Sequence, residues 1–126
     1  MPTPTAARKD PDPSTVAAKA VTRAAELLDI TGRDLAAIIG VSEASLSRMK
    51  RGDLSFRLSG KPYELALLFI RLYRSLDAIM GGDDTASRQW VRSVNSALGG
   101  QPLSRIKSID GLTHVLAYLD ARRAPL

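Results

Sequence analysis

The feature that most constrains the fold is a long apolar segment between residues 62 and 80. Pro62 is favourable in the first turn of a helix, and the Gly81-Gly82 pair ends the segment. A helix that is apolar on two sides must be buried on two sides. We therefore expect either the central helix of the fold or part of a dimer contact. One apolar face holds Leu65, Leu68, Phe69, Leu72, Leu76 and Ile79, and the other holds Leu67, Ile70 and Tyr73.

The other periodic segments are shorter and also read as helices. Ser14, Thr31, Ser42 and Ser108 stand where a side-chain oxygen can cap a first turn. No segment shows sustained alternation of apolar and polar residues, so the sequence predicts an all-α fold. The expected helices span residues 14–28 (with Val16, Ala20, Ala24, Leu27 and Leu28 inward), 31–39, 42–50, 85–93, 102–107 and 109–123.

Composition excludes several kinds of site. The chain has 126 residues and no cysteine, which removes disulfides and thiolate ligands. His114 is the only histidine, so we expect no zinc site, no cofactor and no enzymatic activity. The net charge of +5 favours an anionic partner such as nucleic acid. The longest apolar run, residues 65–70, is far below the roughly 20 residues that span a bilayer. Because no signal peptide is evident either, we expect a cytoplasmic protein without a membrane partner.

The stretch "LAAIIGVSEASLSRMKRG", residues 35–52, has the pattern of a helix-turn-helix. This motif needs a small residue where the second helix crosses the first, and Ala36 provides it. Gly40 can adopt the left-handed conformation of the turn. Val41, Leu46 and Met49 are spaced to hold the second helix against the first. The alternative is an ordinary helical hairpin with solvated charges.

The exposed face of this second helix has the residues expected to enter a major groove. Arg48 is suited to a bidentate contact with guanine, and Ser42 and Ser47 to contacts with base edges or phosphate. Lys50 makes the end of the helix positive. The complete predicted face comprises Ser42, Glu43, Ala44, Ser47, Arg48, Lys50 and Arg51.

Residues 14–60 resemble the Xre-type helix-turn-helix regulators of bacteria and phages. These regulators often have a glutamine near the start of the first motif helix, where it touches phosphate. This chain has Gly32-Arg33 in that region, so the resemblance assigns the phosphate contact to Arg33.

A second pattern follows: Trp90, Asn95, Leu98-Gly99, Pro102 and then "SIDGLTHVLAYLDARR". It resembles the toxin-binding domain of Xre/MbcA/ParS antitoxins and covers residues 62–123. The resemblance implies a cognate RES-type toxin that consumes NAD⁺, an antitoxin domain covering its active-site cleft, and a homodimer that binds the operon's promoter DNA. From the residues themselves, we expect Trp90 to be core, Asn95 to cap a turn, and Gly99 and Gly100 to take positive φ.

The last helix carries the candidate toxin contacts. Its inward face needs Leu112, Val115, Leu116 and Leu119, which leaves a flank containing a tyrosine and an arginine, types enriched at binding hot spots. The alternative is a solvated helix end whose arginines suit the helix dipole. The predicted toxin-binding residues are Gly111, His114, Tyr118, Arg122, Arg123 and the terminal Leu126.

These patterns predict a flexible arm (1–13), a helix-turn-helix DNA-binding domain (14–60) and a small helical domain for toxin binding and dimerisation (61–126). The function that follows is an antitoxin that blocks its toxin and represses its own operon. One alternative is a stand-alone Xre-family regulator with a dimerisation domain. Another is an interaction module that no longer binds DNA, which Glu43 on the recognition face makes conceivable.

Overall fold

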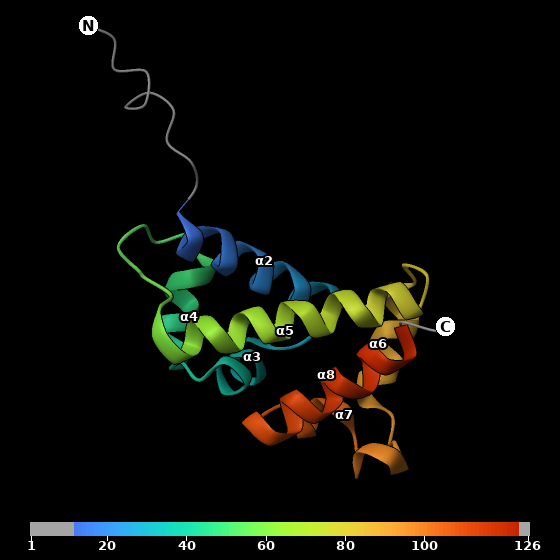
Figure 1. Cartoon of the computed structure of the whole chain (residues 1–126). Coiled ribbons are helices and arrows are strands. Elements are labelled where there is room, and N and C mark those ends of the chain that lie inside the picture. The colour runs from blue at the N-terminus through green and yellow to red at the C-terminus, as the bar shows by residue number, and fades with distance from the viewer. Residues whose placement is uncertain (1–11, 124–126) are drawn as a thin grey trace, which may run out of the picture.

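The computed structural model describes residues 12–123, and within that range the fold is all-α, as expected (Figure 1). The only strand-like pairing there is an isolated bridge between Asn95 and Gly100. None of the helices in this range is long and apolar enough to cross a membrane. The elements are α2 (Pro13–Leu27), α3 (Gly32–Ile39), α4 (Glu43–Lys50), α5 (Gly60–Ile79), α6 (Asp84–Arg92), the 3-10 helix η1 (Ser96–Leu98), α7 (Pro102–Arg105) and α8 (Ile109–Arg123).

Helix α5 is the centre of the fold, which confirms the first of the two expectations for it. It packs against α2 and α3 and also against α8 (Figure 1). Phe69 and Leu72 are fully buried. The two predicted buried faces of α5 included residues that are exposed, because Leu67 is 40% exposed and Ile79 is 37% exposed. Ile79 lies in the last turn, beyond the neighbouring helices that cover the middle of α5.

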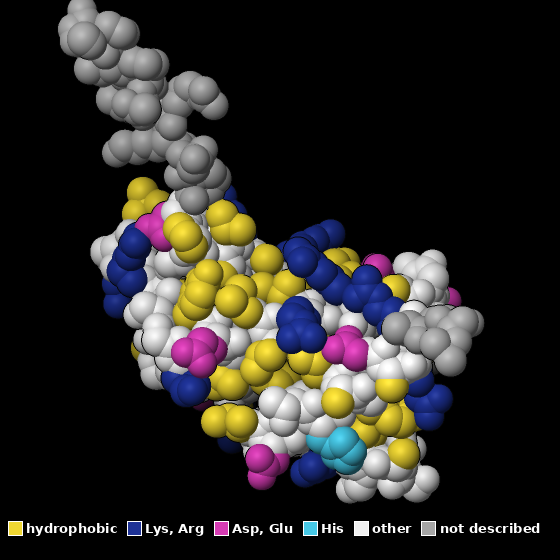
Figure 2. Space-filling model, in the orientation of Figure 1, with side chains coloured by type: hydrophobic (Ala, Val, Ile, Leu, Met, Phe, Trp, Pro, Cys, Tyr) yellow, Lys and Arg dark blue, Asp and Glu magenta, His cyan; other side chains and the backbone are white. Residues whose placement is uncertain are grey.

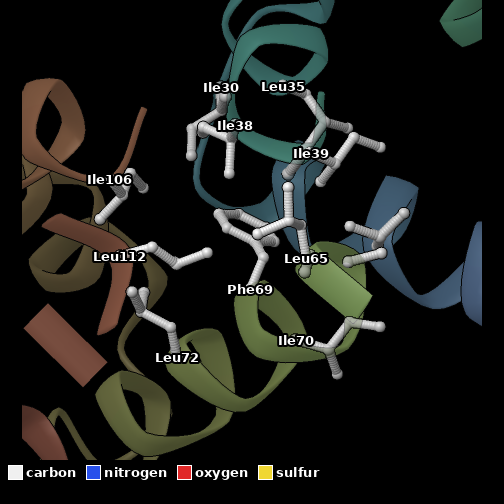
Figure 3. Close-up of a cluster of buried hydrophobic side chains, with 14 of the residues drawn as sticks. Ile30, Leu35, Ile38, Ile39, Leu65, Phe69, Ile70, Leu72, Ile106 and Leu112 are labelled. Atoms are coloured by element: carbon white, nitrogen blue, oxygen red, sulfur yellow. The ribbon is translucent and has the colours of Figure 1, made fainter. Parts of the chain in front are cut away.

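The N-terminal and C-terminal halves share one hydrophobic core. Figure 3 shows Phe69 between Ile38 and Ile39 of α3 and the C-terminal residues Ile106 and Leu112. All of these side chains are at most 2% exposed. The predicted domain boundary at residue 60 coincides with the start of α5, a helix that belongs to the core of both halves.

Polar contacts also join the two halves. The last carbonyls of a helix have no partner within it and need donors from elsewhere. Arg88 of α6 donates to the carbonyl of Leu27 (3.1 Å), and Arg92 donates to those of Leu28 (3.0 Å) and Asp29 (2.6 Å). These two arginines therefore cap α2 from a helix about sixty residues away.

The start of α2 differs from the prediction. Asp12 is the N-cap, and its carboxylate accepts from the Ser14 N–H at 2.8 Å. Ser14 is buried instead, and its hydroxyl accepts from the Leu58 N–H at 2.6 Å. Val16 is 50% exposed whereas Ala17 is buried, so the predicted inward face was wrong there. The alanines of this helix fit several faces equally well, which is why the pattern did not identify the buried one.

The turns of the C-terminal half agree with the sequence. The Asn95 side chain accepts from the Ala97 N–H at 3.0 Å, and Gly99 has a φ of 74°. The Ser108 hydroxyl accepts from the Gly111 N–H at 3.1 Å, at the start of α8. These caps direct α7 against α6 and α8, and they direct α8 back onto α5.

Gly111 has no room for a side chain. A Cβ atom there would lie 1.7 Å from the Arg105 carbonyl oxygen. We expect Gly111→Ala to lower the free energy of unfolding by about 2–3 kcal/mol, because backbone must move to relieve the overlap. Urea unfolding measures the change.

Gly32→Ala is the matched control, since Gly32 is also helical and its Cβ would meet the flexible end of Leu46 at 3.2 Å. Its cost should be clearly smaller, because alanine also favours the helix by about 1 kcal/mol. Equal stability of the Gly111→Ala variant and the wild-type protein would contradict the close approach of α8 to Arg105.

Candidate functional site

Helices α3 and α4 form the predicted helix-turn-helix. Gly40 ends α3 in the left-handed conformation with a φ of 75°. Leu46 and Met49 of α4 are buried, so the opposite side of this helix faces outward. The exposed or half-buried residues from this side and its ends are Ser42, Glu43, Ala44, Ser47, Arg48, Lys50 and Arg51, which is the predicted set.

Ser42 caps the N-terminus of α4 through two hydrogen bonds to Ser45. The Ser42 hydroxyl accepts from the Ser45 N–H at 3.0 Å and donates to the Ser45 hydroxyl at 3.1 Å. Ser42 is thus engaged as a cap. Ala44 and Ser47 present small exposed side chains, which allow close approach to a ligand surface.

Arg48 is held by the connector that follows α4. Its Nε donates to Asp53 Oδ2 at 3.0 Å, and one terminal nitrogen donates to the Ser55 hydroxyl at 2.8 Å. The guanidinium also lies over the Phe56 ring, 5.7 Å from its centre. The sequence prediction placed Arg48 on the DNA face but missed these three partners, because they lie in a segment without periodicity.

The Asp53 carboxylate is the centre of this cluster. The Ser55 hydroxyl and N–H donate to it, and Arg48 adds a hydrogen bond and an opposite charge. These contacts lower the pKa of Asp53 from 3.8 to about 2, and the hydrogen bonds from Ser55 have a larger effect than Arg48. Asp53 therefore stays ionised and keeps Arg48 in place at any ordinary pH.

The N-terminus of α3 has the character of a phosphate site. Arg33 is exposed there, and the Lys50 ammonium lies 3.4 Å from the position that a Cβ on Gly32 would occupy. Free N–H groups at a helix N-terminus favour an anion. The nearby Asp34 is paired with Lys107 at 2.9 Å, which compensates its negative charge.

A second cluster joins α6 and α8. The Trp90 ring stacks on Tyr118 with centroids 6.3 Å apart, and the Arg122 guanidinium lies 4.2 Å from the centroid of the Tyr118 ring. Both aromatic rings are half-buried. Trp90, Tyr118 and Arg122, which we call the aromatic stack, form a continuous surface of the types that dominate protein interfaces.

The other predicted toxin-binding residues do not all join the aromatic stack. His114 is exposed one helical turn from Tyr118. Gly111 is buried against Arg105, so its predicted place on an exposed flank is wrong. Arg123 points toward α5, where it donates to the Ser75 hydroxyl at 3.3 Å. Leu126 lies outside the described residues.

Comparison with known families accounts for nearly the whole chain. Residues 7–71 match the antitoxin Xre-like helix-turn-helix domain, and residues 75–124 match the antitoxin Xre/MbcA/ParS C-terminal toxin-binding domain. The chain belongs to the Xre-like antitoxin family. A search of curated proteins found no match.

The family gives the two clusters of this antitoxin their broad roles. The α3–α4 surface lies in the DNA-binding helix-turn-helix, and the aromatic stack lies in the toxin-binding domain. The boundary between the two matched regions falls inside α5, where the shared core is formed.

Trp90 was expected to be core and to lock its helix to the last helix, and it does pack against the core and stack on Tyr118 of α8. Sequence reasoning missed only that its ring stays half-buried and forms part of a surface with Arg122. The available signal was helical spacing, since Tyr118 and Arg122 are one turn apart and an arginine often stacks on an aromatic ring. Only the packing of α6 against the C-terminal helices brings Trp90 beside them.

The low pKa of Asp53 predicts a pH dependence of stability. A carboxylate whose pKa is lower in the folded state stabilises the protein above its unfolded pKa, and this stabilisation is lost as pH falls. The antitoxin should therefore lose stability between about pH 4 and pH 2 in part through Asp53. Urea midpoints measured across this range should fall less steeply for Asp53→Asn than for the wild-type protein. Parallel slopes for the two proteins would show that the cluster does not form.

Proposed function

We propose that this antitoxin neutralises a RES-type toxin that consumes NAD⁺ and represses its own operon as a homodimer. The aromatic stack carries the first half of the proposal. An exposed arginine on a tyrosine, supported by a half-buried tryptophan, supplies a rigid surface that loses little side-chain entropy on binding. The RES assignment and the NAD⁺ chemistry come from the resemblance of the Trp90-to-Arg122 pattern to the antitoxin family.

The stack lies at the end of α8 that leads to the C-terminus. Arg122 presents its charge above Tyr118, and Arg123 follows on the adjacent side of the helix. We expect the two arginines at this end of α8 to pair with acidic groups of the toxin's cleft. We propose that the toxin's cleft receives this end of the antitoxin, with Arg122 at its edge.

The α3–α4 surface supports the second half of the proposal, which is repression of the operon through DNA binding. Asp53 binds Arg48 through Nε, which leaves the two terminal nitrogens as the pair that can face guanine O6 and N7 once Ser55 rotates away. Arg33 and Lys50 at the N-terminus of α3 are then placed for a phosphate contact. In this arrangement Arg48 reads sequence and Asp53 orients it.

A stand-alone Xre-family regulator is the second candidate, and toxin binding distinguishes it from the antitoxin. Tyr118→Ala should weaken binding of the RES-type toxin about 30-fold or more, in line with the roughly 2 kcal/mol typical of a hot-spot aromatic residue. Co-expression with the neighbouring toxin gene, followed by measurement of cellular NAD⁺, reads out neutralisation. Removal of residues 122–126 should act in the same direction.

Thr113→Ala is the control on the same helix, because Thr113 is exposed and its hydroxyl bonds only to carbonyls of its own helix. It should leave NAD⁺ protected. If Tyr118→Ala and Thr113→Ala both protect NAD⁺ as well as the wild-type antitoxin, the stack is not the contact. If no variant and no wild-type chain binds the toxin, the stand-alone regulator is correct.

Arg48→Ala should weaken operator binding about 10-fold to 100-fold, because one bidentate base contact contributes about 1–3 kcal/mol. Asp53→Ala should weaken it less but in the same direction. Toxin neutralisation should be unchanged in both variants. Fluorescence anisotropy with operator and scrambled duplexes, over a range of salt, measures these effects.

Arg51→Ala is the matched control for charge, since it removes one cation without a base contact. It should lower affinity for both duplexes alike and reduce the salt slope by about one. If Arg48→Ala behaves in that same uniform way, Arg48 contacts phosphate and does not read guanine.

A further inference from the structure

The last turn of α8 extends beyond the part of the helix that the apolar core holds. Leu119 is the last buried residue of α8, and residues 120–123 are half-buried or exposed. The final carbonyls of a helix also lack partners within it, so a last turn without packed side chains frays readily. Arg122, which lies over the Tyr118 ring, belongs to this turn. Its position therefore depends on what fixes residues 120–123.

A polar cluster ties this turn to α5. The Ser75 hydroxyl donates to Asp120 Oδ1 at 2.7 Å, and a terminal nitrogen of Arg71 donates to Asp120 Oδ2 at 3.1 Å. The Ser75 hydroxyl also accepts from Arg123 at 3.3 Å. Figure 2 shows basic side chains next to acidic ones on the surface over α5 and the end of α8. Asp120 and Arg123 stand on either side of Arg122 in the chain, so the turn is tied to α5 at both ends.

Asp120 is the residue on which this polar cluster depends. Each of its two carboxylate oxygens accepts a hydrogen bond from α5. Ser75 is 1% exposed, so its buried hydroxyl would lose its acceptor if the carboxylate were removed. The cluster would then contain Arg71 and Arg123 without an opposite charge, and their repulsion would push the end of α8 away from α5.

The cluster acts on the last turn and contributes little to the stability of the whole fold. The Arg71 and Asp120 side chains are 59% and 41% exposed, and an ion pair this exposed is weakly stabilising by itself. The bond from the buried Ser75 hydroxyl to the carboxylate is charge-assisted and shielded, so it has the larger local effect. The rest of α8 is held by its buried apolar side chains. Loss of Asp120 should therefore release residues 120–123 and leave the core intact.

We propose that Asp120 is a positioning residue for toxin binding, because it holds the last turn of α8 against α5 and so keeps Arg122 over Tyr118. A turn that is ordered before the toxin arrives loses less conformational entropy on binding. The inference rests on the proposed function, since it takes the aromatic stack as the toxin contact. Its first test needs no toxin, so failure of the tether is distinguishable from failure of toxin neutralisation.

Hydrogen–deuterium exchange of the full chain, resolved by NMR, tests the tether. In Asp120→Ala, the amides of residues 120–123 should exchange at least about 5-fold faster than in the wild-type protein, because the last turn opens more often. The amides of residues 112–116, in the middle of the same helix, should exchange at the wild-type rate. Equal exchange at residues 120–123 in the two proteins overturns the proposal, as does the same acceleration along the whole helix.

Arginine variants of α5 provide the matched pair. Arg71→Ala should accelerate exchange in the last turn, though less than Asp120→Ala does. Arg74→Ala is the control, because Arg74 is an exposed arginine one turn further along α5 and is not a partner of Asp120 within residues 12–123. It should leave exchange in the last turn unchanged. An equal effect of the two substitutions would show that general charge, and not the contact with Asp120, fixes the turn.

Toxin affinity, measured by isothermal titration calorimetry with the product of the neighbouring toxin gene, tests the consequence. Asp120→Ala should weaken binding about 5-fold to 10-fold, because affinity falls with the fraction of molecules in the competent conformation. Operator binding should be unchanged. In a chain that ends at residue 121, the same substitution should have no effect, since the turn that Asp120 positions is absent. Unchanged affinity in the full chain overturns the proposal, and an equal loss in both chains shows that Asp120 contacts the toxin itself and overturns the positioning role.

Discussion

Burial of α5 on both sides is the constraint on which the rest of the structure depends. Its middle is in contact with α2, α3 and α8, and Phe69 is completely buried there. Burial of one such aromatic side chain contributes about 1.5–3 kcal/mol, a substantial part of the stability of a domain this size. Within residues 12–123, neither half has another long apolar helix that could replace α5 in its core. The helix-turn-helix and the C-terminal helices therefore fold as one unit around it.

This arrangement fixes the DNA-binding and toxin-binding surfaces relative to each other. The α6 arginines that cap α2, and the ion pair between Lys107 and Asp34, add polar links between the two halves. The ion pair between Lys107 and Asp34 lies at the N-terminus of α3, next to the candidate phosphate contact. A toxin bound to the C-terminal toxin-binding domain is consequently held at a set position with respect to DNA bound to the helix-turn-helix. Any coupling between the two ligands has a short path through packed side chains and through α5.

The features predicted correctly are those encoded by neighbouring residues. Thr31, Ser42, Asn95 and Ser108 cap within three residues of themselves, so the sequence alone identified the starts of three helices and one turn. The features missed depend on contacts between distant residues. Ser14 was expected to be a cap but bonds to Leu58, 44 residues away. The partial exposure of Trp90 and the burial of Gly111 against Arg105 were also unexpected, because both depend on how α8 packs in the fold.

In the proposed complex, the Arg48 cluster prepares a base contact before DNA arrives. A free arginine loses much side-chain entropy when it is fixed, up to about 2 kcal/mol. Here Asp53 and the Phe56 ring already restrict the guanidinium, while only the Ser55 bond must be exchanged. In the proposed contact, one hydrogen bond to a hydroxyl would be replaced by two to a guanine, and Asp53 would remain ionised because its pKa is about 2. The connector after α4 would then be part of the recognition element, since its Asp53 and Phe56 fix the direction in which Arg48 points.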